Sequence, residues 1–220
     1  KAVQGDSAAY HGYWGVDFTT TDPRLGSEAD FKELVSAAHK LNLKVIVDVV
    51  INHTADVIYY ENGKPKVSKA EASIKKPNWL NAISNYHNLG NNPVRGNAAL
   101  DGDFFGLDDL ATEKEVVIKG WIDIWSTWIT KFDIDGMRID TFKHVNPEFW
   151  KRFIPEIKKV AAKAGKTDFP IFGEAADADP ETLATYVAGG QVSSVLDFAF
   201  QKKMKSFVQY GFSAQELAEL

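Results

Sequence analysis

The residues best equipped for chemistry in this sequence stand at the ends of short apolar runs. Carboxylates, histidines and basic residues gather there rather than in the polar stretches between the runs. They are Asp48, Asn52, His53, Arg138, Asp140, Lys143, His144 and Glu174. Taken singly, each is more often a hydrogen-bonded core group or a solvated loop residue than a functional one. Because three separate runs end in this way, we predict that these residues share one site.

Two of these residues have the relation that a catalytic pair needs. Arg138 and Asp140 are two apart, so a strand presents both on one face. A fixed guanidinium favours the ionised carboxylate, which is the form that a nucleophile requires. Glu174 has no cationic neighbour in sequence, and a carboxyl group in a partly apolar cleft has a raised pKa, which suits a general acid. Such a pair is the minimum for glycoside hydrolysis, and it is equally suited to bind a metal in an α/β hydrolase or isomerase.

The elements that must position these residues alternate along the chain. Buried strands are predicted over residues 44–50, 133–139, 169–172 and 194–200. Helices are predicted from capping boxes at Ser27, Thr112 and Ser213, and after Asn146-Pro147 and Asp179-Pro180. Alternating strands and helices without a hairpin signal are typical of a parallel sheet with right-handed crossovers. A doubly wound sheet and a (β/α)₈ barrel both satisfy this order.

Three of the predicted helices carry an apolar stripe at helical spacing. The stripes are Phe31, Leu34, Val35, Ala38 and Leu41; then Val117, Trp121, Ile124 and Trp128; then Phe149, Phe153, Ile157 and Val160. The stretch from Thr54 to Gly106 has no such pattern and is rich in Asn, Gly, Lys, Ser and Pro. It is too long for a connector in a compact domain, so we expect an inserted subdomain there.

Composition excludes several classes of function. The 220 residues carry a formal net charge of −5, which gives no basic surface for nucleic acid. The absence of cysteine excludes disulfides, thiolate nucleophiles and cysteine-bound zinc. No apolar run approaches the ~20 residues of a membrane span. We therefore expect neither nucleic acid nor a membrane as a partner.

Five segments give the sequence a specific resemblance to the α-amylase family of glycoside hydrolases, in which they stand in the same order. They are His11-Gly-Tyr-Trp14, Asp48-Val-Val-Ile-Asn-His53, Leu107-Asp-Asp-Leu110, Gly136-Met-Arg-Ile-Asp140-Thr-Phe-Lys-His144 and Phe172-Gly-Glu174. The resemblance covers essentially the whole chain. It implies an α/β fold, a partial (β/α)₈ TIM barrel with a small subdomain inserted after the third barrel strand.

The resemblance also implies how the chain is divided. Residues 1–53 would form the barrel segment from the loop after strand 2 to strand 3. Residues 54–106 would form the inserted subdomain, and residues 107–220 the barrel segment from helix 3 to helix 6. The first barrel strand, most or all of the second and the last two are not in the sequence. We therefore expect the chain to be a piece of a longer enzyme.

The matching positions have defined roles in the family. Asp140 matches the nucleophile that forms a covalent glycosyl intermediate, and Glu174 the acid/base. Arg138 matches the arginine that orients and ionises the nucleophile, and Asp48 a structural carboxylate beside it. The residues that match sugar-binding positions are His11, Tyr13 and His53 at the cleaved-bond subsite, and Lys143 and His144 on the leaving side.

The resemblance further implies a structural calcium ion between barrel and subdomain. The matching ligands are Asn52, Asp109 and the backbone oxygen of His144, with Asp108 in place of Asp109 if the register shifts by one residue. Oxygen ligands from separate segments are what a hard cation requires. The family also uses a third catalytic acid in an Asn-His-Asp motif, which does not occur between Glu174 and Leu220. By itself this chain is therefore not expected to turn over substrate.

The function that the resemblance implies is retaining hydrolysis of α-1,4-glucosidic bonds in starch-like α-glucans. Close alternatives are an amylase–pullulanase that also accepts α-1,6 bonds and a transglycosylase such as a cyclodextrin-forming enzyme. A non-catalytic α-glucan-binding protein and a metal-dependent enzyme with Asp48, His53 and Glu174 as ligands are alternatives of other classes. The whole protein is expected to be a monomer, secreted to the outside of the cell or to the periplasm, with any signal segment upstream of Lys1.

Overall fold

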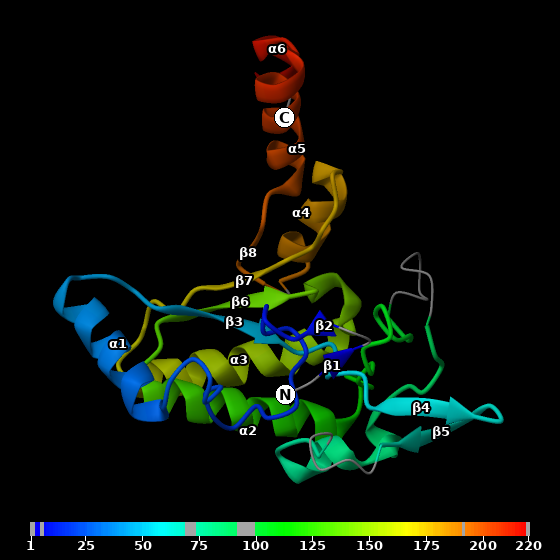
Figure 1. Ribbon diagram of the computed structural model, residues 1–220. Coiled ribbons are helices and arrows are strands. Elements are labelled where there is room, and N and C mark those ends of the chain that lie inside the picture. Colours follow the sequence, from blue (N-terminus) through cyan, green and yellow to red (C-terminus); the bar gives the residue numbers. More distant parts are fainter. Residues whose placement is uncertain (1–2, 5–6, 69–73, 92–99, 191, 219–220) are drawn as a thin grey trace.

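A four-stranded parallel sheet in the order β3-β6-β7-β8 lies at the centre of the protein (Figure 1). The computed structural model describes residues 3–4, 7–68, 74–91, 100–190 and 192–218. The strands of the sheet are β3 (Ile46–Val50), β6 (Gly136–Asp140), β7 (Ile171–Gly173) and β8 (Ser194–Val195). The helices are α1 (Glu28–Lys40), α2 (Glu115–Phe132), α3 (Pro147–Lys163), α4 (Pro180–Ala188), α5 (Phe198–Tyr210) and α6 (Ala214–Ala218).

The sheet confirms the predicted parallel arrangement. Each strand pairs in parallel with the next one along the chain, and a helix lies between β6 and β7 and between β7 and β8. Helix α2 and the segment before it connect β3 to β6. Because all four strands run the same way, their carboxyl ends meet at one edge of the sheet.

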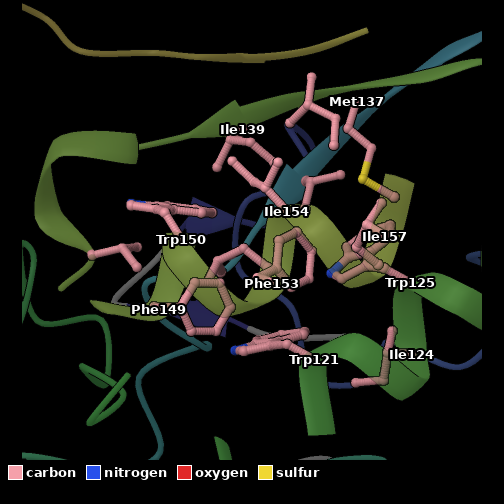
Figure 2. Close-up of a cluster of buried hydrophobic side chains, with 14 of the residues drawn as sticks. Trp121, Ile124, Trp125, Met137, Ile139, Phe149, Trp150, Phe153, Ile154 and Ile157 are labelled. Carbon is pink, nitrogen blue, oxygen red and sulfur yellow. The ribbon is translucent and has the colours of Figure 1, made fainter. Parts of the chain in front are cut away.

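The core lies between this sheet and helices α2 and α3. In Figure 2, Met137 and Ile139 project from β6 onto α3, and Trp121 of α2 lies beyond the α3 side chains. The predicted stripe of α3 is buried at Phe149, Phe153 and Ile157, and that of α2 at Val117, Trp121 and Ile124. Truncating one such aromatic side chain typically costs about 3–5 kcal/mol. This packing holds β6, which carries Arg138 and Asp140.

Of the predicted helix starts, that of α1 is confirmed, that of α2 is wrong, and that of α3 is confirmed without its side-chain cap. The capping box of α1 is present, since Ser27 accepts a hydrogen bond from the Asp30 N–H and Asp30 accepts one in return. The capping box predicted at Thr112 is wrong, because α2 begins at Glu115 without a side-chain cap. The Thr112 hydroxyl donates to Asn146 Oδ1 over 2.6 Å instead. Helix α3 does start at Asn146-Pro147, as predicted. The Asn146 side chain does not cap the helix, because it accepts the hydrogen bond from Thr112 instead.

All four predicted strands differ in their bounds from the observed ones, and the first two are Ile46–Val50 and Gly136–Asp140 instead of 44–50 and 133–139. The strand expected over residues 194–200 is only Ser194–Val195, and the last three residues of that run, Phe198–Phe200, belong to α5. Asp197 starts this helix by accepting a hydrogen bond from the Phe200 N–H over 2.8 Å. A short apolar run is compatible with either a strand or a helix, and here the Asp197 cap favours the helix. The strand predicted over 169–172 lies at Ile171–Gly173.

Helices α1 and α6 were each predicted in part. In α1 the start is as expected, but of the stripe only Val35 is buried, and Leu34 and Leu41 are exposed. Helix α6 begins at Ala214, directly after the predicted cap Ser213. We expected this helix to continue to the end of the sequence, and its last two residues, 219–220, lie outside the described residues.

The stretch predicted as an insertion contains regular structure of its own. Strands β4 (Ile58–Glu61) and β5 (Lys64–Val67) form an antiparallel hairpin. Its turn is Asn62-Gly63, and both residues have positive φ, at 52° and 72°. Asn-Gly is a strong signal for such a turn, and it lies in a stretch where no strand or hairpin had been predicted. Outside this stretch, β1 (Val3–Gln4) pairs antiparallel with β2 (Ser7–Ala8).

Within the described residues, no helix is both long and apolar enough to cross a membrane.

Candidate active site

Three strands bring the predicted catalytic residues to one edge of the sheet. In the β3–β6 ladder Asp48 lies opposite Arg138, and Val50 lies opposite Asp140. In the β6–β7 ladder Ile139 lies opposite Gly173, so Glu174 follows at the level of Asp140. The register therefore places Asp140 and Glu174 at the same height, and Asp48 two residues earlier on its strand, level with Arg138.

The Arg138 side chain joins these three carboxylates. Its Nη1 donates to Asp48 Oδ1 over 2.6 Å and to Asp140 Oδ1 over 3.0 Å. Its Nη2 lies 3.0 Å from Glu174 Oε1. The prediction that Arg138 and Asp140 face the same side is confirmed. Glu174 has no cationic neighbour in sequence, but the structure supplies one, Arg138, from a different strand.

Electrostatics at this cluster differ from the sequence-based expectation. Burial is the main cause that raises the pKa of Asp140, to about 6, and the charges of Glu174 and Asp48 add to it, while Arg138 opposes the rise. Burial also works against the charge of Arg138, but the Asp48 hydrogen bond and the three carboxylate charges outweigh it and raise the pKa of the guanidinium. Arg138 alone was expected to keep Asp140 ionised. The two neighbouring carboxylates, which come from other segments, reduce that effect.

Glu174 is oriented by the backbone that follows Asp140. Thr141 has a positive φ of 47°, which is strained for a β-branched residue. In this conformation its N–H donates to Glu174 Oε2 over 3.2 Å. The next N–H, of Phe142, donates to the Glu174 carbonyl oxygen over 2.9 Å. Strained backbone of this kind is common at functional sites, where the surrounding structure enforces it.

Tyr13 and His11 reach the cluster from the loop before α1. The Tyr13 hydroxyl donates to Asp48 Oδ2 over 2.8 Å. Burial, and then the hydrogen bond to Asp48, raise the pKa of this hydroxyl, so it remains a donor at neutral pH. The His11 ring stacks on the Tyr13 ring, and its Nδ1 accepts a hydrogen bond from the Tyr13 N–H over 3.1 Å. His11 thus contacts both the ring and the backbone of Tyr13.

A cavity of about 420 Å³ opens directly against the two catalytic candidates. Its lining residues are Tyr13, Trp14, His53, Phe104, Phe105, Leu107, Asp140, Thr141, Lys143, His144, Glu174 and Ala176. All of the predicted catalytic and sugar-binding residues except Arg138 and His11 are among them, and the structural carboxylate Asp48 is not. A cavity of this size, with carboxylates and aromatic rings on its walls, is typical of a small-molecule or sugar site.

Several lining residues were not singled out in the sequence. Phe104 and Phe105 come from the stretch without helical or strand periodicity, so no pattern marked them. The Phe104 ring lies 5.9 Å from the His53 ring and 4.9 Å from the His144 ring, measured between centroids. Phe105 has a positive φ of 53° and its side chain is largely exposed at the cavity. Trp14 belongs to the segment His11-Gly-Tyr-Trp14, but no function was predicted for it.

The predicted basic residues of the site occupy different environments. His53 is buried, burial lowers its pKa to about 4, and its Nε2 has no hydrogen-bond partner within the described part of the chain. Lys143 Nζ donates to the Ala176 carbonyl oxygen over 2.6 Å, which ties the end of β6 to the loop after β7. A neutral imidazole and an ammonium group therefore flank the cavity.

The residues predicted to bind calcium are close to one another but differ in their contacts. Asn52 is buried and its Oδ1 has no hydrogen-bond partner among the described residues. The Leu110 N–H donates to the Asn52 carbonyl oxygen, which brings the neighbouring Asp109 close to Asn52. Burial raises the pKa of Asp109 to about 7, although the hydrogen bond from His87, at 2.5 Å, opposes this. An orphaned amide oxygen and a buried carboxylate fit a hard cation.

Two alternatives for metal binding find less support. Asp108 is committed to Lys75 and to the Val57 and Ile58 N–H groups, so it is not available in place of Asp109. Asp48, His53 and Glu174 do not converge, and the described residues contain no cluster of three His, Cys, Asp or Glu that could hold a metal ion.

Comparison with known proteins identifies the family. Residues 2–219 match the family model described as the catalytic domain of alpha amylase. This chain belongs to the α-amylase family. An α-amylase from Streptomyces lividans is 39% identical over 264 residues, covering 99% of this chain and 29% of that protein. A cyclomaltodextrin glucanotransferase from Thermoanaerobacterium thermosulfurigenes is 31% identical over 217 residues, covering 91% of this chain and 28% of that protein.

Solved structures of the α-amylase family agree with the fold. An α-amylase from Geobacillus thermoleovorans, complexed with acarbose, matches with a TM-score of 0.72 at 33% identity, covering 90% of this chain and 40% of that one. An α-amylase from Malbranchea cinnamomea matches with a TM-score of 0.79 at 25% identity, covering 100% of this chain and 44% of that one. These domains are (β/α)₈ barrels, so the parallel sheet is part of such a barrel and not a doubly wound sheet. The chain spans less than half the length of these relatives.

Proposed function

We propose that the protein containing this chain is a retaining glycoside hydrolase that cleaves α-1,4-glucosidic bonds of starch-like α-glucans. The observation that carries the proposal is the pair of carboxylates, Asp140 and Glu174, held by one guanidinium at the wall of a cavity. Membership of the α-amylase family and the relatives named α-amylase support the same activity.

The proposed reaction uses the two carboxylates in turn. Asp140 attacks the anomeric carbon and forms a glycosyl ester, while Glu174 protonates the oxygen of the leaving sugar. Glu174 then takes a proton from water, which attacks the anomeric carbon and releases Asp140. Arg138 stabilises the Asp140 carboxylate before it attacks and again as it leaves the ester, because its Nη1 lies 3.0 Å from Oδ1. The third acid of the family is not in this chain.

The walls of the cavity suit a glucose ring. We propose that the Tyr13 ring stacks on the sugar at the cleaved bond and that His53 hydrogen-bonds its hydroxyl groups. This role is supported by the His53 Nε2, which is buried without a partner among the described residues, and by the position of the residue in the cavity lining. Lys143 and His144, which line the same cavity, are proposed to contact the sugar on the leaving side.

The test of this proposal is hydrolysis of a nitrophenyl maltooligosaccharide by the full-length protein. We expect turnover by the wild type and a loss of about 10⁴-fold or more in Asp140→Asn, because an amide cannot form the ester. Asp123→Asn, the same change on the exposed side of α2, is the matched control and keeps full activity. A full-length protein that binds maltoheptaose without cleaving it would replace the hydrolase with a glucan-binding protein.

Transglycosylation is the second candidate, supported by the cyclomaltodextrin glucanotransferases among the relatives. Phe105 offers an exposed ring at the cavity, where a second sugar can stack before it accepts the glycosyl group. The product profile on starch separates the two activities. Linear short products indicate a hydrolase, and cyclic or elongated products indicate a transferase.

We also propose a structural calcium ion held by Asn52, Asp109 and the His144 carbonyl oxygen. The support is the orphaned Oδ1 of buried Asn52 beside a buried carboxylate. A bound cation would neutralise the Asp109 charge and join the barrel to the segment before α2. Calorimetry of calcium binding to the chelator-treated full-length protein tests this. We expect tight binding by the wild type and none by Asn52→Ala, and equal binding by both would exclude this site.

A further inference from the structure

A buried ion pair joins Lys75 of the inserted segment to Asp108, which lies just after that segment. Lys75 Nζ is 2.7 Å from Asp108 Oδ2, and the two side chains are 2% and 1% exposed. The Lys75 ammonium also donates to the Tyr86 hydroxyl over 3.0 Å, and that hydroxyl donates to the Leu80 carbonyl oxygen over 2.6 Å. None of these groups takes part in the proposed reaction.

The carboxylate of this pair also organises backbone from the start of the insertion. Asp108 accepts hydrogen bonds from the Val57 and Ile58 N–H groups, each at 3.1 Å. Its own carbonyl oxygen accepts one from the Thr54 N–H over 3.0 Å. Asp108 therefore joins three segments: the start of the insertion after β3, the segment around Lys75, and its own segment before α2.

These segments hold a proposed sugar-binding residue between them. His53 stands between Asn52, whose carbonyl oxygen accepts from the Leu110 N–H, and Thr54, which donates to Asp108. His53 itself forms an isolated bridge with Asp109, the residue after Asp108. The backbone of His53 is thus fixed from both sides by residues 108–110, which the ion pair holds in place.

Stability alone does not account for a pair of this kind. Taking two charges out of water costs several kcal/mol per ion, and apolar residues of similar volume are often as stabilising or more so. Consistent with that cost, burial lowers the pKa of Lys75 even though the Asp108 charge and hydrogen bond oppose the change. A buried polar pair does, however, restrict the arrangement of its segments more narrowly than apolar contacts do.

We propose that Lys75 and Asp108 are positioning residues that hold His53 in place at the reacting sugar. This inference rests on the proposed sugar-binding role of His53. Its immediate consequence is that Lys75 affects the chemistry through His53 and not directly.

A double-mutant cycle in the full-length protein tests the coupling. Lys75→Met is expected to lower kcat for the nitrophenyl maltooligosaccharide about tenfold, because hydrogen bonds to the sugar strengthen in the transition state. KM is expected to change less than about twofold. In the His53→Ala background the same change is expected to lower kcat less than about twofold, since the residue through which it acts is gone. Lys76→Met, the exposed neighbour, is the control and leaves kcat unchanged.

A spectroscopic measurement decides the inference without any activity. In histidine-labelled full-length protein, the His53 ring resonance, identified by its loss in His53→Ala, should shift or broaden in Lys75→Met and stay unchanged in Lys76→Met. An unchanged resonance in folded Lys75→Met, or equal losses of kcat in both backgrounds, would overturn the positioning role. If the wild type hydrolyses nothing, the proposed function fails while this measurement still stands.

A second variant covers a failure to fold. In Asp108→Asn the amide oxygen can take the place of Oδ2, which accepts from both the Val57 and the Ile58 N–H groups, while the charge and the second acceptor oxygen are lost. If Lys75→Met does not fold, Asp108→Asn is expected to show the same pattern in both measurements. If neither variant folds, the pair serves the stability of the insertion, and the positioning role is wrong.

Discussion

Arg138 contacts more charged groups than any other residue of the described site, and its partners come from three strands. Asp48, Asp140 and Glu174 each lie within 3.0 Å of its guanidinium nitrogens. A planar guanidinium with donors in several directions can serve three carboxylates at once, which the compact ammonium of a lysine cannot. The ionisation of Asp140 therefore depends on how Arg138 is shared, and not on its presence alone.

The first prediction follows from this sharing and concerns Asp48→Asn. The Asp48 charge raises the pKa of Asp140, and its carboxylate also draws Arg138 away from Asp140. Removing the charge therefore lowers the pKa of Asp140 on both counts. Since the nucleophile must be ionised, the acidic limb of the pH profile of kcat/KM, near pH 6 in the wild type, should move to lower pH.

The pH profile of kcat/KM for the full-length protein is the measurement. Asp123→Asn, exposed on α2, should leave the acidic limb in place. A limb that stays unchanged or moves to higher pH in Asp48→Asn would show that Asp140 is not the group that titrates there.

At the scale of elements, the loop after β7 is tightly packed where Glu174 leaves the strand. A Cβ atom added at Gly173 would come within 2.5 Å of the Phe142 ring. That ring is buried and stacks on Trp150 of α3, with centroids 4.4 Å apart. The absence of a side chain at Gly173 thus lets β7 approach the turn after β6, which brings Glu174 to Asp140.

The second prediction is that Gly173→Ala displaces Glu174 and destabilises the fold. Overpacking by a methyl group in a filled core costs about 1–3 kcal/mol. We expect that loss in the free energy of unfolding in urea, together with a fall of about tenfold or more in kcat, since catalysis tolerates little displacement. Adding Phe142→Ala makes room for the methyl group, so the effects of the two changes on stability should be less than additive. Strict additivity would contradict the clash.

The same scale shows which elements are predictable from sequence. Strand β3 and the start of α1 depend on local features, a β-branched run and the Ser27–Asp30 capping box, and both were predicted. Thr112 has the same local spacing, but its hydroxyl bonds to Asn146, which is 34 residues away. The start of α2 is therefore set by a tertiary contact that local spacing does not contain.

In the site, too, some positions follow from local sequence and others depend on tertiary contacts. That Arg138 and Asp140 share a face follows from strand geometry alone. The contact of Glu174 with Arg138 depends on the pairing of β6 with β7, and the position of Phe104 against His53 and His144 depends on the fold of the insertion. Neither is encoded in a local pattern, so both appear only in the structure.

At the scale of the whole molecule, an ion cluster joins the ends of the sheet opposite the site. Asp135, just before β6, accepts hydrogen bonds from the Val45 N–H, before β3, and from Lys166, after α3, each over 2.8 Å. His39 of α1 lies 2.7 Å from the same carboxylate. Burial disfavours the charge, but these three partners outweigh it and hold the pKa of Asp135 well below its usual value.

The third prediction is a loss of stability in acid through this cluster. A carboxyl group whose pKa is lower in the folded state stabilises the fold above its unfolded pKa, near 3.8, and loses that contribution as pH falls toward the folded value. Asp135→Asn should therefore cost about 3 kcal/mol at neutral pH, where the wild-type pair is intact. The difference between wild type and variant should shrink below about pH 4.

Urea unfolding of the full-length protein from pH 7 to pH 3 measures this difference. Asp133→Asn, two residues away and largely exposed, is the control and should change stability by less than about 1 kcal/mol. A difference for Asp135→Asn that is constant with pH would contradict the assignment.

The most direct test of the whole account is to trap the glycosyl-enzyme intermediate. Glu174→Gln in the full-length protein is incubated with an activated fluorinated maltosyl donor, and peptides are analysed by mass spectrometry. Because the variant can still form the ester but lacks the base that activates water, we expect a stable maltosyl adduct on the peptide that contains Asp140, and none in the double variant with Asp140→Asn. An adduct on another residue, or none with any donor that the wild type cleaves, would contradict Asp140 as the nucleophile and Glu174 as the acid/base.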